Sequence, residues 1–243
     1  PISPLDPRDK DTFVIKFNSS GKELFKVQIG SLNEDRGFGI DTDAEDNFYI
    51  GGFIKGDIDT SDSQSYNSNE DMFFAKYDTN GELQWLKQIG DTTVDIINAV
   101  KTGSDKSVYI YGSNKDTTGE GGGAGGDEGG GDAEDPFLGK FSTINGDLIW
   151  SENYQDLQNR SYKGTSFTVF KELTDPSLIN FWIGDLIAII GYNNQNNKGF
   201  LAEISSSNGG LIDSTYIQTD DEPNKIFYPY SVHHDSFGTL YIV

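Results

Sequence analysis

The sequence predicts an all-β protein made of four-stranded antiparallel sheets, and three observations support this. One pattern of about twenty residues recurs four times, and its copies start at Asp11, Asp71, Asp135 and Lys198. Within each copy, apolar residues alternate with others on both sides of a short polar turn, which is typical of a β-hairpin. A phenylalanine recurs at intervals of about 60 residues, at Phe13, Phe73, Phe137 and Phe200. Four-stranded antiparallel units repeated at this spacing are the pattern of β-propeller blades.

The second copy, DMFFAKYDTNGELQWLKQIG, is the clearest hairpin. Its strands cover 71–77 and 83–89, and Asp78-Thr79-Asn80-Gly81 forms the turn. Asn-Gly between two apolar runs is the strongest short-range signal for a hairpin. The first strand is apolar on both faces, so we expect its sheet to be packed between two neighbouring sheets.

The remaining strands follow in a fixed order along the chain. The pair 37–43 and 47–53 precedes the hairpin at 71–89, and these four strands define positions A, B, C and D of one blade. The order then repeats. The full set of expected strands is 11–17, 23–29, 37–43, 47–53, 71–77, 83–89, 97–102, 107–112, 136–141, 148–154, 164–171, 186–192, 199–204, 211–217, 228–234 and 239–243.

We expect residues 1–243 to form a single propeller or a part of one, with repeats near 11–70, 71–134, 135–197 and 198–243. Residues 119–134 are a Gly-rich acidic loop insert with nothing to bury, so we expect them to be disordered. Residues 173–185 are a second insertion, for which we expect an extra turn or short helix.

The repeat begins out of frame, because the chain starts with C and D strands and ends with A and B strands. If these two halves meet, they close a four-bladed ring, the small end of the propeller range. Otherwise the chain is an arc of a larger propeller. The arc is favoured because TLYIV stops where the other B strands continue into Gly-containing loops.

Composition excludes several classes of function. The net charge of −21 disfavours nucleic-acid binding, because such a surface repels phosphate. The absence of cysteine excludes disulfides and thiolate sites. No run of 18 apolar residues exists, so we expect no membrane span. The first residues, PISPLDPRDKD, lack the apolar region of a signal peptide, so either one was removed or the chain is a piece of something longer.

The hairpins resemble the SBBP-type β-propeller repeat, D-x-F-x-x-K-Y-D-x-x-G, followed by an aromatic strand and a D-x-x-G-N-x-Y-x-x-G hairpin. The matching residues are Asp71, Phe73, Lys76, Tyr77, Asp78, Gly81 and Trp85, together with the stretch from Asp46 to Gly52. The fourth copy departs, with Lys198 in place of the Asp and Glu203 in place of the Lys. The resemblance implies a propeller of an exported or surface-attached protein and no shared enzymatic activity.

Two sets of residues are candidate cation sites. Asp41, Asp43 and Asp46 are closely spaced carboxylates of the kind that suits Ca²⁺, which makes calcium the candidate cofactor. The alternative is a strand-ending Asp with an Asx turn. His233 and His234 are adjacent in an expected strand, so they point to opposite faces and cannot easily bind one metal.

A lysine recurs on strand C as Lys16, Lys76 and Lys140. A functional ring of lysines is one interpretation. Structural pairing with a nearby Asp, or a buried stem with an exposed ammonium, is favoured.

No nucleophile, base and orienting group converge in the sequence. We therefore expect a non-catalytic extracellular or cell-surface module, secreted or surface-bound, that serves adhesion or assembly. Its partners would be proteins, glycans or further copies within a larger chain or filament, bound on the face that has the long loops. The alternative is a propeller enzyme. Gly81–Trp85 and Gly146–Trp150 resemble quinoprotein repeats, and the many carboxylates would suit a glycosidase.

Overall fold

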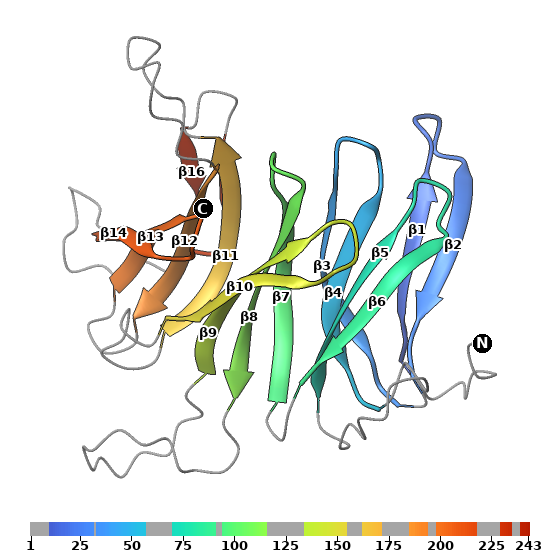
Figure 1. Ribbon diagram of the computed structural model, residues 1–243, viewed down its shortest axis with the longest axis horizontal. Coiled ribbons are helices and arrows are strands. Elements are labelled where there is room, and N and C mark those ends of the chain that lie inside the picture. The colour runs from blue at the N-terminus through green and yellow to red at the C-terminus, as the bar shows by residue number, and fades with distance from the viewer. Residues whose placement is uncertain are drawn as a thin grey trace.

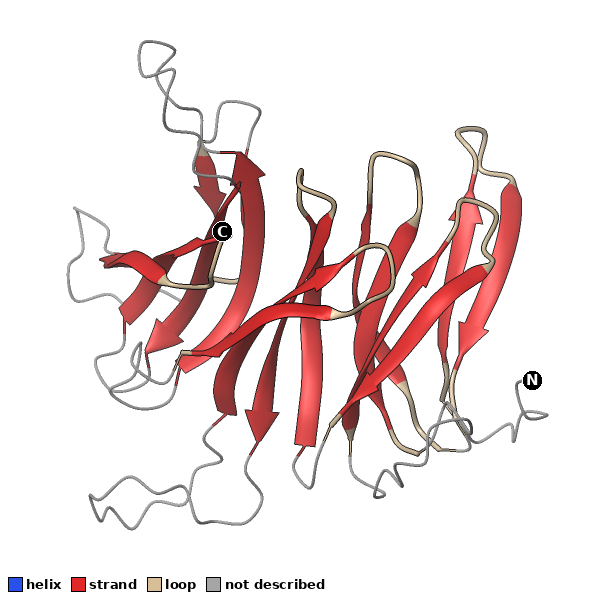
Figure 2. Cartoon of the chain, viewed as in Figure 1, coloured by secondary structure: helices blue, strands red, loops and turns tan. Residues whose placement is uncertain are grey.

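The computed structural model describes residues 10–31, 33–56, 70–90, 94–115, 134–154, 162–171, 185–193, 198–217, 229–234 and 239–243. Every regular element within these ranges is a strand, as Figure 2 shows. The expected extra turn at 173–185 and the Gly-rich insert lie almost wholly outside the described residues.

Three four-stranded antiparallel sheets, which we call blades, form the body of the chain (Figure 1). Each has its strands in sequence order, as the A-B-C-D assignment predicts, and a two-stranded sheet precedes and follows them. The first blade contains β3 (Arg36–Thr42), β4 (Phe48–Ile54), β5 (Asp71–Tyr77) and β6 (Leu83–Ile89). The second contains β7 (Val94–Thr102), β8 (Ser107–Lys115), β9 (Glu134–Ser142) and β10 (Leu148–Asn153). The third contains β11 (Tyr162–Lys171), β12 (Asp185–Asn193), β13 (Lys198–Ser205) and β14 (Leu211–Ile217).

The two-stranded sheets correspond to the two predicted half-blades, a C–D pair at the start of the chain and an A–B pair at its end. One pairs β1 (Thr12–Phe17) with β2 (Glu23–Ile29), and the other pairs β15 (Val232–His234) with β16 (Leu240–Ile242). They lie near opposite ends of the row in Figure 1 and remain separate sheets. The described chain is therefore an open row of blades and not the four-bladed ring. β15 begins at Val232, later than the expected residue 228. Pro229 has no N–H group to donate to a strand ladder. The Tyr230 N–H donates to the Val243 carbonyl, beyond the end of the β15–β16 ladder.

The turns between strands C and D share one geometry. In each, a glycine has positive φ, which is the left-handed region that glycine adopts at no steric cost. These glycines are Gly21 (79°), Gly81 (84°), Gly146 (71°) and Gly209 (74°). The ladder register shifts just before or after each turn, as between Lys76 and Tyr77. Asn-Gly and related pairs in the sequence predicted these turns correctly.

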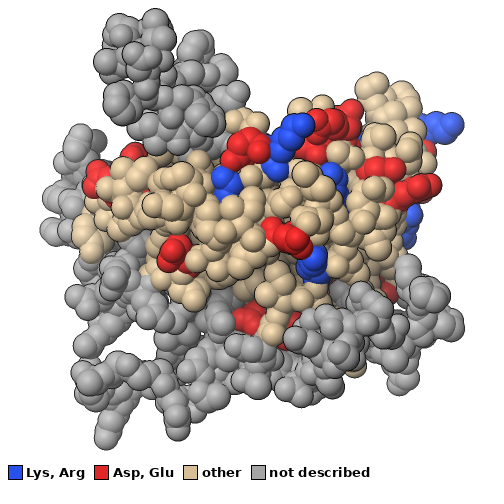
Figure 3. All heavy atoms as spheres, viewed as in Figure 1, with Lys and Arg blue, Asp and Glu red and all other residues tan. Residues whose placement is uncertain are grey.

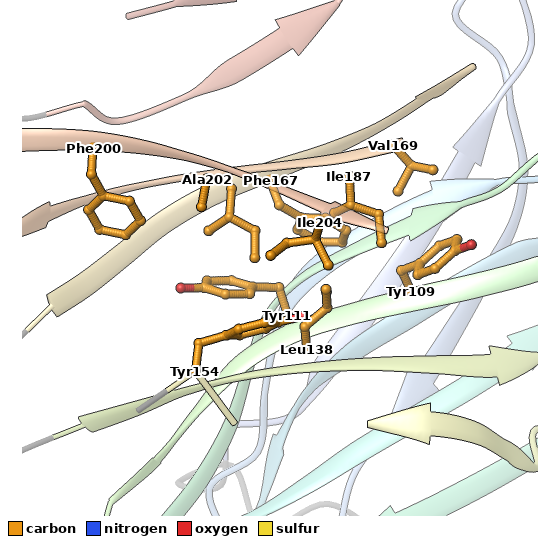
Figure 4. Packing of buried hydrophobic residues seen from close by; sticks show 11 residues of the cluster. Tyr109, Tyr111, Leu138, Tyr154, Phe167, Val169, Ile187, Phe200, Ala202 and Ile204 are labelled. Carbon is orange, nitrogen blue, oxygen red and sulfur yellow. The ribbon is translucent and has the colours of Figure 1, made fainter. Parts of the chain in front are cut away.

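The hydrophobic core is divided among the interfaces between successive sheets. One cluster joins β1–β2 to the first blade, a second joins the first and second blades, and a third joins the second and third. Figure 4 shows the third cluster, in which Tyr111 and Leu138 face Phe167 and Ile187. Because every inner blade packs on both faces, β4 is buried along its whole length. This explains why the strands are apolar on both faces.

Candidate interaction surface

The recurrent lysine of strand C reaches from its own sheet to the C–D turn of the next. Lys16 Nζ donates to the Thr79 carbonyl at 3.0 Å, and Lys76 Nζ donates to the Thr143 carbonyl at 2.9 Å. The third lysine, Lys140, donates to the Ser206 carbonyl at 2.9 Å and to Asp105 Oδ2 at 2.7 Å. All three ammonium groups therefore bind neighbouring turns, and the predicted pairing with an Asp is found at Lys140.

An aromatic side chain on strand D completes each contact. Phe25, Trp85 and Trp150 are the cross-strand neighbours of the three lysines. Each ring lies against the positive-φ glycine of the next turn, where an added Cβ would come within 2.8–2.9 Å of a ring atom. The two indole N–H groups also donate to the turn carbonyls, at 3.4 Å for Trp85 and 3.1 Å for Trp150. We call each lysine and aromatic pair a turn clamp.

The third blade has a different pair at the clamp position. Glu203 and Asp213 are the corresponding cross-strand neighbours. A carboxylate accepts hydrogen bonds and does not donate them when ionised, so this pair cannot bind a turn carbonyl as the lysines do. Sequence comparison of the copies detected the change at Glu203 and missed the change at Asp213.

The three aspartates of the predicted calcium site have separate hydrogen-bond partners. Asp41 Oδ2 accepts from the backbone N–H of Thr102 at 2.8 Å, on the next blade. Asp43 accepts from the Asn47 backbone at 3.0 Å and from the Tyr49 hydroxyl at 2.8 Å, which is the Asx-turn arrangement. Asp46 is exposed at φ 62° in the same turn. Calcium binding stays a prediction, and the ion would compete with these hydrogen bonds.

The Asp43 carboxylate has two opposed influences on its pKa. Burial raises the pKa, but hydrogen bonds from Asn47, Tyr49 and the Glu45 backbone lower it by more, so the pKa lies below 3.8. A folded-state pKa below the unfolded value means that this stabilisation is complete well above pH 3.8 and is lost as the pH falls through the folded-state pKa.

We expect Asp43→Ala to lower the free energy of unfolding by about 1–2 kcal/mol at pH 7, because several hydrogen bonds to a partly exposed carboxylate are lost. The difference from wild type should shrink below pH 3.8. Urea unfolding at pH 7 and pH 3 measures this, with Glu45→Ala as the exposed control. A difference that does not change with pH would contradict the role given to the ionised carboxylate. Thermal unfolding with millimolar Ca²⁺ tests the cation hypothesis, which requires a rise in the wild-type Tm that Asp43→Ala abolishes.

The two histidines do not form a common site. Thr168 Oγ1 and His234 Nδ1 are 2.9 Å apart, which joins β11 to β15. His233 is exposed and pairs in register with Tyr241. In the described part of the chain, no group of three or more His, Asp or Glu side chains is arranged to hold a metal ion.

Buried acidic residues that sequence reasoning missed fix the ends of the blades opposite the C–D turns. Asp71 is fully buried at the start of β5 and accepts from Gln88 Nε2 at 3.0 Å. Asp35 is also buried and accepts from the Lys55 backbone at 2.8 Å. Burial raises the pKa of the Asp35 carboxyl, although hydrogen bonds from Ser31 and Lys55 oppose this. The signal for the Asp71 contact was present, because an Asp and a Gln recur at the same separation as Asp11 and Gln28.

The outer D strands expose large apolar side chains. These exposed residues are Leu83 (50 %), Leu148 (56 %), Ile149 (53 %), Leu211 (45 %), Ile212 (52 %) and Tyr216 (46 %). We call this set the outer rim. In Figure 1, β6 and β10 run across the front of the molecule, and in Figure 3 few charged side chains interrupt that front, while most gather near the upper edge. Exposed apolar residues grouped in this way are typical of contact surfaces.

Comparison with known proteins supports the architecture. No known family model matches the chain. Over 113 residues the chain is 26 % identical to "Uncharacterized WD repeat-containing protein L264" of Acanthamoeba polyphaga mimivirus. The matched region covers 39 % of this chain and 8 % of that protein. The crystal structure of Saccharomyces cerevisiae Sqt1 superimposes with a TM-score of 0.50 at 11 % identity, over 96 % of this chain and 52 % of Sqt1. The fold is a β-propeller fold.

A second solved structure, quinohemoprotein alcohol dehydrogenase from Comamonas testosteroni, has a TM-score of 0.47 at 12 % identity, over 95 % of this chain and 35 % of that enzyme. The chain spans about half the length of Sqt1 and a smaller share of the other two proteins. The likeness to SBBP-type repeats stays a prediction. The described residues include no helix that could cross a membrane.

Proposed function

We propose that the chain is a non-catalytic protein-binding module of a secreted or cell-surface protein. The observation that supports this most is the outer rim, where leucines at one repeated position are about half exposed on successive blades: Leu83 at 50 % and Leu148 at 56 %. A repeat scaffold that offers an evenly spaced apolar row suits an extended protein partner.

The edges of the blades support the same proposal. Each D strand pairs with strand C on one side, and its other edge has no ladder partner among the described strands. An extended segment of a partner can add to such an edge by backbone hydrogen bonds, while side-chain pockets give selectivity. The acidic balance of the chain, with a net charge of −21, favours a partner surface that is neutral or basic.

The distribution of polar groups accords with a structural role for most of them. The turn clamps, Asp41 and Asp43 all use their polar atoms to join blades or close turns. Such groups hold a rigid scaffold, and the rim that they leave exposed is where a partner would bind.

We expect Leu83→Ser with Leu148→Ser to weaken partner capture at least tenfold. The partner would cover the exposed half of each leucine side chain, and the serine variants remove this apolar contact area. The folded protein itself should lose less than about 1 kcal/mol per site, since these side chains are already half exposed. Immobilised wild-type chain and variant are compared for capture from the culture medium and surface extract of the source cells. Immunolabelling of intact cells tests the location.

Ser104→Ala with Lys106→Ala is the matched control, because both residues are exposed and lie in the β7–β8 turn, which is not part of the rim. Loss of capture by the control, or equal capture by the rim variant, would contradict the proposed surface. A glycan array measured with the same proteins separates a protein partner from a sugar.

A further inference from the structure

The turn between β1 and β2 contains a motif that has no part in the proposed binding surface. Asn18, Ser19 and Ser20 match N-x-[ST] without a proline in the middle, which is the acceptor sequence for N-linked glycosylation. A second match, at 159–161, lies outside the described residues. Such matches also arise by chance in a chain that contains many asparagines and serines, so the motif alone decides nothing. The geometry of the turn is what distinguishes Asn18.

The Asn18 side chain is held in the turn by its carbonyl oxygen. Oδ1 accepts from the backbone N–H groups of Ser20 at 3.0 Å and Lys22 at 2.9 Å, which is the Asx-turn arrangement. It also accepts from the Ser20 hydroxyl at 2.7 Å. Nδ2 has no hydrogen-bond partner among the described residues. Attaching a sugar to Nδ2 therefore breaks none of the hydrogen bonds that hold the side chain.

The turn has room for a bulky substituent. Every residue from Phe17 to Leu24 is exposed. A Cβ built on Gly21, at the tip of the turn, would meet no atom within 4 Å. In Figure 1 the turn lies at the upper edge of the molecule. The described structure therefore places no side chain where a glycan on this turn would extend.

This access does not depend on what precedes the hairpin. The equivalent turn of the first blade is covered by the lysine and phenylalanine of the β1–β2 clamp. Asp78, which occupies the position of Asn18 in that turn, is still partly exposed, and Thr79 and Asn80 are fully exposed. A further sheet packed on β1–β2 in the same way would therefore leave the Asn18 position open to solvent.

The turn itself does not require an asparagine. Asp78 Oδ1 accepts from the backbone N–H groups of Asn80 and Glu82, each at 2.9 Å, with the same residue spacing as at Asn18. An aspartate supplies the same acceptor oxygen and has no side-chain N–H group when ionised. The fold therefore uses Oδ1 of Asn18 and leaves its amide nitrogen without a structural task.

We propose that Asn18 is an N-glycosylation acceptor, and that the donor is an oligosaccharide linked through its C1 atom to a lipid pyrophosphate. In the transfer, Asn18 Nδ2 forms a bond to C1 while the bond between C1 and the pyrophosphate oxygen breaks. The pyrophosphate leaves with the electron pair of that bond, and Nδ2 gives up one of its two protons to a base of the transferring enzyme. The donors on Oδ1 favour loss of this proton, because they polarise the amide toward its oxygen.

This inference rests on the location in the proposed function, because a lipid-linked oligosaccharide is offered to chains that enter a secretory pathway. It does not use the outer rim or the identity of a protein partner. A glycan is bulky and hydrophilic, so one at Asn18 would keep other molecules away from this turn.

Peptide mapping tests the proposal on the full 243-residue chain, expressed in cultured eukaryotic cells with a cleavable secretion signal and recovered from both cells and medium. Trypsin cleaves after Lys16 and Lys22, and the peptide 17–22 contains Asn18 as its one asparagine. We expect mass spectrometry to find this peptide with a glycan, and enzymatic release of the glycan to leave Asp in place of Asn18. Ser20→Ala should reduce the glycosylated fraction to background, whereas Ser20→Thr should retain it.

Asn18→Asp removes the acceptor nitrogen and keeps the turn, since Asp78 closes the equivalent turn. It should lack the glycan and match wild type by circular dichroism. Ser19→Ala is the matched control, because it leaves both ends of the motif intact and should keep the glycan. An unmodified wild-type peptide, or a glycan that survives Ser20→Ala, would overturn the inference.

The peptide measurement does not require that a variant folds. Because the secretion signal is supplied, its result reports on Asn18 alone. Immunolabelling of the source cells tests the natural location separately, so failure of the proposed function and failure of this inference can be told apart.

Discussion

Replacing Phe74 by alanine should lower the free energy of unfolding by about 3–5 kcal/mol, the usual loss for a buried phenylalanine. Phe74 is completely buried. Its ring packs edge to face against the rings of Trp85 and Phe141, with centroids 5.0 Å and 5.6 Å away. The contact with Phe141 joins the first blade to the second, and the contact with Trp85 lies within the first blade. A cavity there therefore removes packing from both blades and cannot be closed by a shift of one side chain. Guanidinium unfolding followed by tryptophan fluorescence measures the loss.

Phe38→Ala is the matched control for this variant. Phe38 is 50 % exposed and has one aromatic neighbour, Phe53, at 5.9 Å. Its loss should stay near 1 kcal/mol, because half of the ring is already in water. Equal losses for the two variants would show that the interface between blades is not what stabilises the fold.

Replacing Lys140 by alanine should lower the free energy of unfolding by about 2–4 kcal/mol, the range for breaking a mostly buried, hydrogen-bonded ion pair. Lys140 is 7 % exposed, so its removal leaves the Ser206 carbonyl and the Asp105 carboxylate without the ammonium that they contact. The Lys140 ammonium also lies 5.4 Å from the Tyr109 ring centroid, a cation–π contact that the variant loses.

Lys16→Ala makes the same chemical change at the equivalent position and provides the comparison. The Lys16 ammonium binds exposed atoms of Thr79, where water can replace it, so the loss should be about 1 kcal/mol or less. Chemical unfolding of both variants under the same conditions measures the two losses. If Lys16→Ala lowers the free energy of unfolding as much as Lys140→Ala does, burial does not determine how strongly a turn clamp stabilises the fold.

Local sequence rules predicted most of the strands because their signals lie within a few residues of one another. β5 and β6 begin and end where the alternation and the Asp78–Gly81 turn indicated. The expected strand 228–234 was too long, since the apolar and aromatic residues near Tyr230 outweighed the effect of Pro229. Recurrence at about 60 residues likewise predicted stacked sheets, because a regular repeat buries its faces on its neighbours.

The candidate sites could be predicted less well, because their atoms come from separate blades. The sequence placed Asp41 beside Asp43 and Asp46, but the structure directs the Asp41 carboxylate to Thr102 on the next blade. Nothing local to Lys76 indicates that its ammonium reaches Thr143, which is 67 residues away.

The sequence by itself determined the strands, their order within each blade and the recurrence of a lysine on strand C, all of which follow from alternation, turn chemistry and spacing. Only the tertiary structure decided which polar groups join the blades, that the two half-blades stay apart, and that Glu203 and Asp213 reverse the clamp at one end. The physical reason is that strand formation depends on neighbours in the chain, whereas these contacts depend on how the sheets stack. That stacking is set by side-chain packing between residues distant in sequence.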